Sequence, residues 1–357
     1  MSGIRYNELN IKRLQKWGDW KMAVTNNDVA KRAGVSIATV SRVLNGAENV
    51  GPLLYQKVNA AINDLGYVPN FTAQSLKQSS SKLIGITASD LSVAFFPEVV
   101  KCVEKRFLPK GYATIVSSTY DDPENEKTIL QHMFARRPDA LLINSTGQNE
   151  QTLEQILASG TPVIFYDRPP RDKNFPSVYA DKNKSMYIAA EYLTSLGHRK
   201  IRLITGPRML SSNYERYMGI QRFIFDKNLD PADFSFTFGE FSYSNGYATT
   251  EAIFQMDVQE RPTAIITGSI AITAGILAYC EEHDIAVPRS LSIISSGNFP
   301  YGNVAGIKLT YLDDRSYQLA EITANLLEQC LAGEKIPSNY RMALEPILHV
   351  QDTTGAR

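Results

Sequence analysis

The sequence has little cysteine and no long apolar run, and both shortages limit where the protein can work. Its 357 residues include three cysteines, Cys102, Cys280 and Cys330, which are odd in number and far apart. This spacing argues against a disulfide framework and for a reducing compartment. No apolar run approaches the roughly 18 residues of a membrane span, and the N-terminal region lacks the apolar stretch of a secretory signal. We therefore expect a cytoplasmic protein without a membrane partner.

The common catalytic and cofactor motifs are missing as well. The chain has no GxxxxGK[ST] phosphate loop, no HExxH, no CxxC and no GxSxG, and its four histidines are scattered. We therefore expect no enzymatic activity, no cofactor and no bound metal.

Net charge is also absent, because 37 Lys+Arg balance 37 Asp+Glu. The balance conceals a separation along the chain: residues 1–78 carry ten basic and five acidic residues, and the remainder carries 27 and 32. A basic front segment precedes an acidic body, so the zero total does not exclude a nucleic-acid partner.

Residues 1–21 hold both tryptophans and five of the ten basic residues of the front segment. They are either a basic arm that contacts a polyanion or sequence upstream of a start at Met22, and we favour the second interpretation.

The pattern from Val24 to Asn45 predicts a helix-turn-helix. Thr25 is suited to cap a first helix, and Gly34 can end it with the positive φ that the turn requires. Ser36 can cap a second helix, and a third helix continues the pattern. Inward-facing apolar positions recur at helical spacing at Val29, Ala30, Ala33, Val40, Val43, Leu44, Val58, Ala61, Ile62 and Leu65.

This segment resembles the headpiece of the lac-repressor (LacI/GalR) family of bacterial transcriptional regulators, whose motif reads D-V-A-x-x-A-G-V-S-x-x-T-V-S-R-V-L-N. The matching residues are Asp28, Val29, Ala30, Ala33, Gly34, Val35, Ser36, Thr39, Val40, Ser41, Arg42, Val43, Leu44 and Asn45. A second signature of the family follows at Gly66, Tyr67, Val68, Pro69, Asn70, Ala73, Ser75 and Leu76.

The second helix of such a motif enters the major groove with its N-terminal residues against the base edges. We therefore place Ile37 and Ala38 at the groove floor, where they read only shape and thymine methyl groups. Arg42, one turn later, can bond guanine bidentately. The other predicted DNA-binding residues of the headpiece are polar and suited to phosphates: Thr25, Ser36, Thr39, Ser41 and Asn45. For Thr39 and Ser41, plain polarity of the helix surface is an open alternative.

Residues 69–82 are expected to form a hinge helix and linker. The resemblance implies that this helix folds on DNA, pairs with its counterpart in the partner subunit and inserts Leu76 into the minor groove. Ala73 would allow the close approach of the two helices, Asn70 is a further predicted DNA-binding residue, and an ordinary linker leucine is the alternative for Leu76. The polar segment 78–82 is typical of a flexible connector.

The body alternates strands and helices from Leu83 onward, which predicts an α/β fold of two doubly wound parallel sheets with a ligand cleft at their carboxyl ends. The predicted strands are 83–88, 113–118, 140–143, 162–166, 201–205, 264–267 and 291–295. This part resembles the periplasmic-binding-protein-like core of the same family. The expected domains are an extension (1–21), a helix-turn-helix headpiece (22–68), the hinge (69–82), a core (83–350) and a tail (351–357). Within the core, the N-subdomain is expected to take about 83–180 plus 309–340, and the C-subdomain about 181–308 plus 341–350.

The resemblance also implies an effector site in the core cleft. Its expected residues are Phe95, Phe96, Asp167, Arg168, Arg216, Phe241, Ser269, Asn298 and Asp313. For Arg216 we favour ligand binding, whereas a structural salt bridge is an equal alternative for Asp167 and Asp313. The sequence departs from the family at Ser269-Ile270 and Ser295–Asn298, where two carboxylates are missing. Because Arg168 and Arg216 are kept, the hypothesis is an anionic or phosphorylated sugar-type effector.

These features predict a homodimeric transcriptional regulator, a repressor that binds a pseudo-palindromic operator in double-stranded DNA and responds to a sugar, sugar acid or sugar phosphate. The alternative is a solute-binding protein of a sugar transport system built on the same core fold. The DNA-binding segment argues against that alternative.

Overall fold

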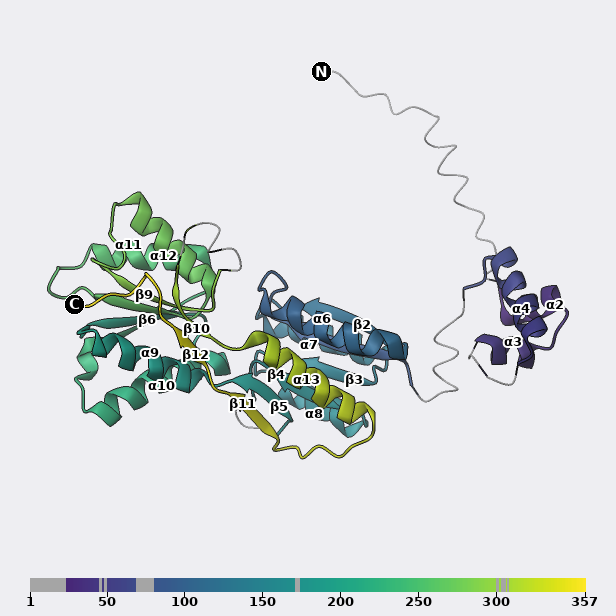
Figure 1. Ribbon diagram of the computed structural model, residues 1–357. Coiled ribbons are helices and arrows are strands. Elements are labelled where there is room, and N and C mark those ends of the chain that lie inside the picture. Colours follow the sequence, from purple (N-terminus) through teal and green to yellow (C-terminus); the bar gives the residue numbers. More distant parts are fainter. Residues whose placement is uncertain are drawn as a thin grey trace, which may run out of the picture. The chain divides into compact units, whose positions relative to one another are not determined.

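The computed structural model describes residues 24–44, 47, 50–68, 80–170, 174–299, 302, 306 and 308–357 (Figure 1). The chain divides into two units, Met1–Ser79 and Ser80–Arg357. Among the described residues, no helix has the length and apolar character that crossing a membrane would require.

The first unit contains the predicted three-helix headpiece, with α2 (Asn26–Ala33), α3 (Ile37–Leu44) and α4 (Pro52–Leu65). Thr25 and Asp28 form a reciprocal capping box at the start of α2, and Gly34 ends the helix at φ 67°. The side chains of Val29, Val40 and Val58 are fully buried in the centre of this small core. The positive φ predicted for Gly34 is therefore confirmed.

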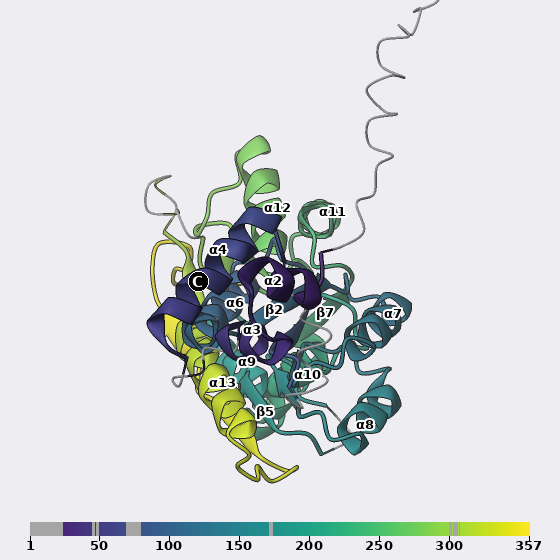
Figure 2. The ribbon, with the colours of Figure 1, turned by 90° about the vertical axis from the view of Figure 1, so that its right-hand side faces the viewer.

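The second unit contains two six-stranded sheets, which confirms the predicted pair of doubly wound sheets. The first has the strand order β11-β5-β4-β3-β1-β2, and all its neighbouring strands are parallel. Helices α6 and α13 cover one face, and α7 and α8 cover the other (Figures 1 and 2). Its elements are β1 (Leu83–Ala88), α6 (Phe95–Phe107), η1 (Leu108–Lys110), β2 (Ala113–Ser118), α7 (Pro123–Phe134), β3 (Ala140–Ile143), α8 (Glu150–Ala158), β4 (Val163–Tyr166), β5 (Ser177–Ala180), α13 (Ser316–Leu331) and β11 (Arg341–Leu344).

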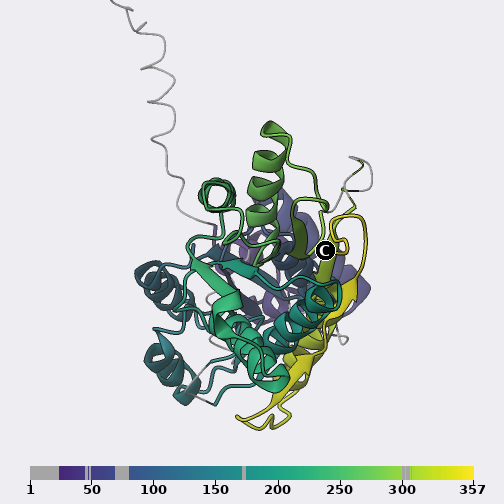
Figure 3. The same cartoon turned by 90° about the vertical axis from the view of Figure 1, so that its left-hand side faces the viewer.

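The second sheet has the order β12-β10-β9-β8-β6-β7, with only the β10–β12 pair antiparallel. Helices α9 and α10 pack on one face, and α11 and α12 on the other (Figure 3). Its elements are α9 (Lys182–Ser195), β6 (Ile201–Thr205), α10 (Ser211–Lys227), η2 (Pro231–Asp233), β7 (Phe234–Phe238), α11 (Tyr243–Phe254), β8 (Ala264–Thr267), α12 (Ile270–Glu282), β9 (Ser292–Ser296), β10 (Thr310–Asp313) and β12 (Ile347–His349).

The chain crosses between the sheets three times, and this corrects the expected subdomain boundaries. Strand β10 pairs with β9 and therefore belongs to the second sheet, although residues 309–340 were assigned to the N-subdomain. Strand β11 pairs with β5 in the first sheet, although residues 341–350 were assigned to the C-subdomain. The crossings lie between β5 and α9, between β10 and α13, and between β11 and β12. Backbone pairing, which the apolar pattern does not reveal, decides these memberships.

Two further expected boundaries are wrong for a similar reason. The predicted linker extends to residue 82, but the Ser81 amide donates to Asp139 Oδ1 at 2.7 Å and the Ala113 amide donates to the Lys82 carbonyl at 2.8 Å. The predicted tail, 351–357, is part of the second subdomain, since the Ile293 amide donates to the Thr353 carbonyl at 2.8 Å and the Arg357 amide to the Leu196 carbonyl at 2.8 Å.

Candidate DNA-binding helix and effector cleft

The start of α3 is fixed by local hydrogen bonds that leave its first residues exposed. The Thr39 amide donates to Ser36 Oγ at 3.1 Å, and the two hydroxyl groups lie 2.9 Å apart. Ile37 follows this cap with half of its surface exposed (51%), although it is a large apolar residue. An exposed isoleucine at the first turn of a capped helix is suited to an apolar contact in a groove.

The predicted DNA-binding residues fall into three groups. Ile37, Ala38 and Arg42 are exposed on α3, as a reading surface requires. The Thr25, Ser36 and Thr39 hydroxyl groups are engaged in helix caps, which favours a structural role for them. Ser41 is half-buried, and Asn45, Asn70, Ala73 and Leu76 lie outside the described residues.

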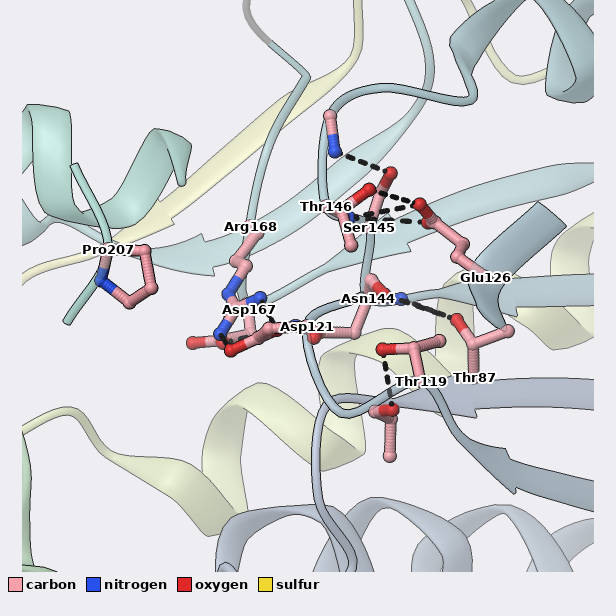
Figure 4. A network of polar contacts seen from close by, with 12 residues as sticks. Thr87, Thr119, Asp121, Glu126, Asn144, Ser145, Thr146, Asp167, Arg168 and Pro207 are labelled. Carbon is pink, nitrogen blue, oxygen red and sulfur yellow. Dashed lines mark hydrogen bonds and ion pairs between the residues drawn. The ribbon is translucent and has the colours of Figure 1, made fainter. Parts of the chain in front are cut away.

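In the second unit, the loop after β4 carries the two predicted residues Asp167 and Arg168. Arg168 is almost fully buried and forms a bidentate ion pair with Asp121, with Nη2 3.2 Å from Oδ2 (Figure 4). Burial opposes the charged form of Arg168, but the carboxylate of Asp121 outweighs it and raises the pKa of the guanidinium. Asp121 follows β2 and was not predicted, because its partner lies 47 residues away in the sequence.

Asp167 adopts a left-handed backbone conformation, φ 63°, which is uncommon for a residue other than glycine. Its Oδ2 accepts a hydrogen bond from Asn144 Nδ2 at 3.2 Å, and its Oδ1 lies 3.7 Å from Lys182 Nζ. Lys182 Nζ is also 2.5 Å from Asp314 Oδ2. The structural salt bridge that was an open alternative for Asp167 is thus present, together with a hydrogen bond to the buried Asn144.

Arg216 on α10 is 5% exposed, and no carboxylate among the described residues lies within 4 Å of it. Its Nη1 donates to Asn213 Oδ1 at 2.9 Å, and its guanidinium lies 5.9 Å from the ring centre of Phe241. Burial lowers the pKa of Arg216, and the more distant carboxylates of Asp314 and Asp167 counteract this. Among the described residues, Arg216 Nε has no hydrogen-bond acceptor and Asn144 Oδ1 has no hydrogen-bond donor. An unused donor and an unused acceptor therefore remain near the carboxyl ends of the two sheets.

The two predicted phenylalanines separate into different roles. Phe96 is 3% exposed and packs in the core, whereas Phe95 is half-buried at the start of α6. Both rings contact Tyr166, with centroids 6.0 Å from Phe95 and 6.1 Å from Phe96. Phe95 is therefore the better candidate for ligand contact.

The remaining predicted residues lie at the carboxyl edge of the second sheet. Ser269 caps α12 by accepting from the Ile272 amide at 3.3 Å, and Asn298 hydrogen-bonds Tyr311. Asp313 accepts from the Arg315 amide at 2.7 Å and lies 3.7 Å from His349 Nε2. These contacts favour the structural interpretation of Asp313.

A cavity of about 220 Å³ lies beside Arg168, between loops of both subdomains. Its wall consists of Ser145, Thr146, Gly147, Gln148, Glu150, Phe165, Arg168, Pro169, Pro170, Met209 and Ser211. The loop after β3 is held by the fully buried Glu126, whose carboxylate contacts the Thr146 hydroxyl (Figure 4). Its Oε2 also accepts from Asn149 Nδ2 at 2.9 Å. Of the predicted effector residues, only Arg168 lines this cavity.

Comparison with known proteins gives matches over both units. Residues 25–70 match the bacterial regulatory proteins of the lacI family, and residues 190–354 match a periplasmic binding protein-like domain. The chain is 30% identical over 305 residues to the HTH-type transcriptional repressor PurR of Klebsiella pneumoniae, covering 85% of this chain and 89% of the relative. It is 28% identical over 319 residues to catabolite control protein A of Priestia megaterium, covering 89% and 96%. The lac repressor dimer bound to operator and the anti-inducer ONPF superimposes with a TM-score of 0.80 at 26% identity, covering 94% of this chain and all of that chain.

Proposed function

The chain belongs to the lacI family of bacterial regulatory proteins. We propose that it is a transcriptional repressor in which the following residues bind the operator and the effector. Ile37, Ala38 and Arg42 read base edges in the major groove. Ser41 and Asn45 fix the register on the phosphates, whereas the hydroxyl groups of Thr25, Ser36 and Thr39 cap helices. Asn70, Ala73 and Leu76 act in the minor groove of the operator. As in the operator complex of the lac repressor dimer, the unit that binds DNA is a dimer.

The effector is a small carbohydrate-like molecule at the carboxyl edges of the two sheets. The observation that carries this proposal is the pair of unused buried atoms, Arg216 Nε and Asn144 Oδ1. A buried polar atom without a partner costs roughly 1–3 kcal/mol, so a ligand that supplies both an acceptor and a donor gains affinity there. Hydroxyl groups supply both, and the half-buried rings of Phe95 and Phe241 suit the apolar face of a sugar ring.

The expected charge of the effector depends on which buried cation of the cleft has no carboxylate as an ion-pair partner. Arg168 is paired with Asp121 and Lys182 with Asp314, so neither is an open anion site. Arg216 is the remaining buried cation of this region among the described residues. One anionic group, rather than two, therefore fits the cleft: a sugar acid or a monophosphate whose acidic group lies against Arg216.

Effector binding regulates the operator complex by favouring one relative pose of the two subdomains over another. The proposed function involves no catalytic step, and the similar proteins named above are regulators. The solute-binding alternative fails to explain the capped three-helix unit of residues 24–68.

The proposal is tested by a thermal-shift screen of neutral sugars, sugar acids and sugar phosphates, followed by operator release with each ligand that stabilises the protein. Arg216→Ala should weaken ligand affinity by about 10- to 100-fold, because a hydrogen bond to a charged group contributes roughly 1.5–3 kcal/mol. The matched control is Arg222→Ala on the same helix, where the arginine is exposed and pairs with Asp226.

Because Arg216 is buried, the thermal stability of Arg216→Ala and of Arg216→Met is measured without ligand, and a variant that folds is used for the release assay. An operator response in that variant equal to the response of wild type would contradict the role of Arg216. A screen in which only neutral sugars bind would contradict the anionic effector while leaving the cleft assignment in place.

A further inference from the structure

Contacts link residues at the ends of the crossings. The Asp181 amide of the first crossing donates to the carbonyl of Leu344, the last residue of β11, at 2.9 Å. Lys182, the first residue of α9, forms an ion pair of 2.5 Å with Asp314 of the second crossing. A change in the relative pose of the two subdomains must alter the backbone in these segments, so contacts among them bias that change.

Lys182 is the buried charge at this junction. It is 7% exposed, although a lysine is rarely this buried without partners. Its second carboxylate neighbour, Asp167 at 3.7 Å, belongs to the loop after β4 on the first sheet. Lys182 Nζ therefore lies between a residue of the effector cleft and a residue of the second crossing.

Backbone conformation points to the same place. Asp167 at φ 63° and Arg315 at φ 56° both adopt the left-handed region, and Arg315 directly follows Asp314. Such residues persist only where the surrounding contacts hold them. Without the Lys182 ammonium, the two carboxylates would lose the cation between them, and both strained segments would lose a contact.

We propose that Lys182 is a latch between the crossing segments and the effector cleft. Its ammonium group contacts both Asp314 and Asp167 and so stabilises the relative pose that the two subdomains have in this structure. A ligand that engages Asp167 competes with Lys182 for that carboxylate and thereby loosens the crossing. The competition between ligand and Lys182 depends on the proposed effector site, whereas the role of Lys182 in linking Asp314 and Asp167 does not depend on it.

The latch is tested by amide hydrogen exchange of the full-length protein without ligand, comparing wild type with Lys182→Met and Asp314→Asn. Lys182→Met should increase exchange in peptides covering residues 179–184 and 313–316 by about tenfold, because removing one partner of a buried pair leaves the others uncompensated. Asp314→Asn should increase it less, since Lys182 keeps Asp167. Peptides from the sheet core, such as β6 and β8, should exchange as in wild type.

Three further variants give the test its controls. Lys184→Met changes an exposed lysine on the same helix and should leave the exchange unchanged. Lys182→Arg keeps the charge and should retain most of the protection, which also supplies a folded variant if Lys182→Met is unstable. The charge exchange Lys182→Asp with Asp314→Lys should restore part of the protection that Lys182→Asp alone removes.

Two results would overturn the latch. One is exchange in Lys182→Met that matches Lys184→Met, and the other is an increase spread evenly over the sheet core, which indicates global destabilisation. Failure of the effector proposal appears elsewhere, as a screen without any stabilising ligand, and does not alter these exchange patterns.

Discussion

At the scale of single residues, the burial of His198 makes the stability of the folded protein depend on pH. It is 2% exposed, and its ring nitrogens lie 2.8 Å from Thr263 Oγ1 and 2.9 Å from Ser292 Oγ. Burial lowers the pKa of His198, and the charge of Arg357 acts in the same direction, while a hydrogen bond to the Gly355 carbonyl opposes them. The folded protein therefore binds the proton of this histidine less readily than the unfolded chain does.

The stabilisation by neutral His198 should be complete above the unfolded pKa of about 6.5 and should decrease as the pH falls below it. Urea unfolding at pH 7.5 and pH 5.5 measures this loss. His198→Gln should lower the free energy of unfolding by roughly 1–3 kcal/mol at pH 7.5 through lost buried hydrogen bonds, and it should reduce the pH dependence. The control is His132→Gln at an exposed position. Equal pH dependence in wild type and His198→Gln would contradict the role of burial.

Single residues also mark where sequence interpretation stops. Arg216 was identified through its motif, and Gly34 through the demand of a turn for positive φ. Asp121 and Asn144 were missed, although both contact predicted cleft residues. Each follows a different strand, and only the pairing of parallel strands brings them to one edge of the sheet.

At the scale of elements, long apolar strands are easier to predict than short edge strands. Strands β1, β3, β6 and β8 have the predicted bounds, because continuous apolar runs are typical of buried parallel strands, and the edge strand β2 also has its predicted bounds. Strands β5, β7, β10, β11 and β12 were not predicted. β7, β11 and β12 lie at sheet edges and contain many half-exposed positions, so neither a continuous run nor a clean alternation appears. β5 and β10 lie inside their sheets, but each has only four residues and begins with a polar one.

Helix α3 supports a prediction that separates base reading from phosphate binding. Arg42→Ala should weaken the best operator by about 1–3 kcal/mol and relax preference at one guanine, whereas Ile37→Ser should change the preferred base at a neighbouring position. Operators obtained by in vitro selection, followed by fluorescence anisotropy on single-base variants, measure both effects. The comparison variant is Lys57→Ala on α4, an exposed cation that should weaken all sequences equally. Uniform weakening by Arg42→Ala would assign Arg42 to a phosphate instead.

At the scale of the whole molecule, the charge separation and the triple crossing have different origins. The separation between residues 1–78 and the remainder is visible in the sequence and agrees with a DNA-binding unit joined to an effector-binding unit. The crossings depend on which edge strand pairs with which sheet, and so the sequence predicts two subdomains without their correct membership.

The modest charge of the headpiece predicts a shallow salt dependence of operator binding. Between Val24 and Val68 the basic residues are Lys31, Arg32, Arg42 and Lys57, and Arg32 lies 2.6 Å from Asp64. Because Arg42 is assigned to a base and Arg32 is paired with Asp64, a dimer neutralises about four phosphates through Lys31 and Lys57. Affinity should therefore fall by about 10²-fold between 50 and 200 mM salt. Anisotropy titrations across this range measure the slope. A loss of about 10⁵-fold would contradict the estimate.

The same titration distinguishes the two interpretations of residues 1–21. Five further basic residues precede Met22, and contact with DNA would make the slope of the full chain steeper than that of a chain beginning at Met22. Equal slopes are expected if residues 1–21 do not contact the phosphates. The internal reference is Lys57→Ala, which should reduce the slope by about one for each subunit that loses a phosphate contact. A full-length chain whose slope exceeds that of the shorter chain by more than this step would establish residues 1–21 as a DNA-binding arm.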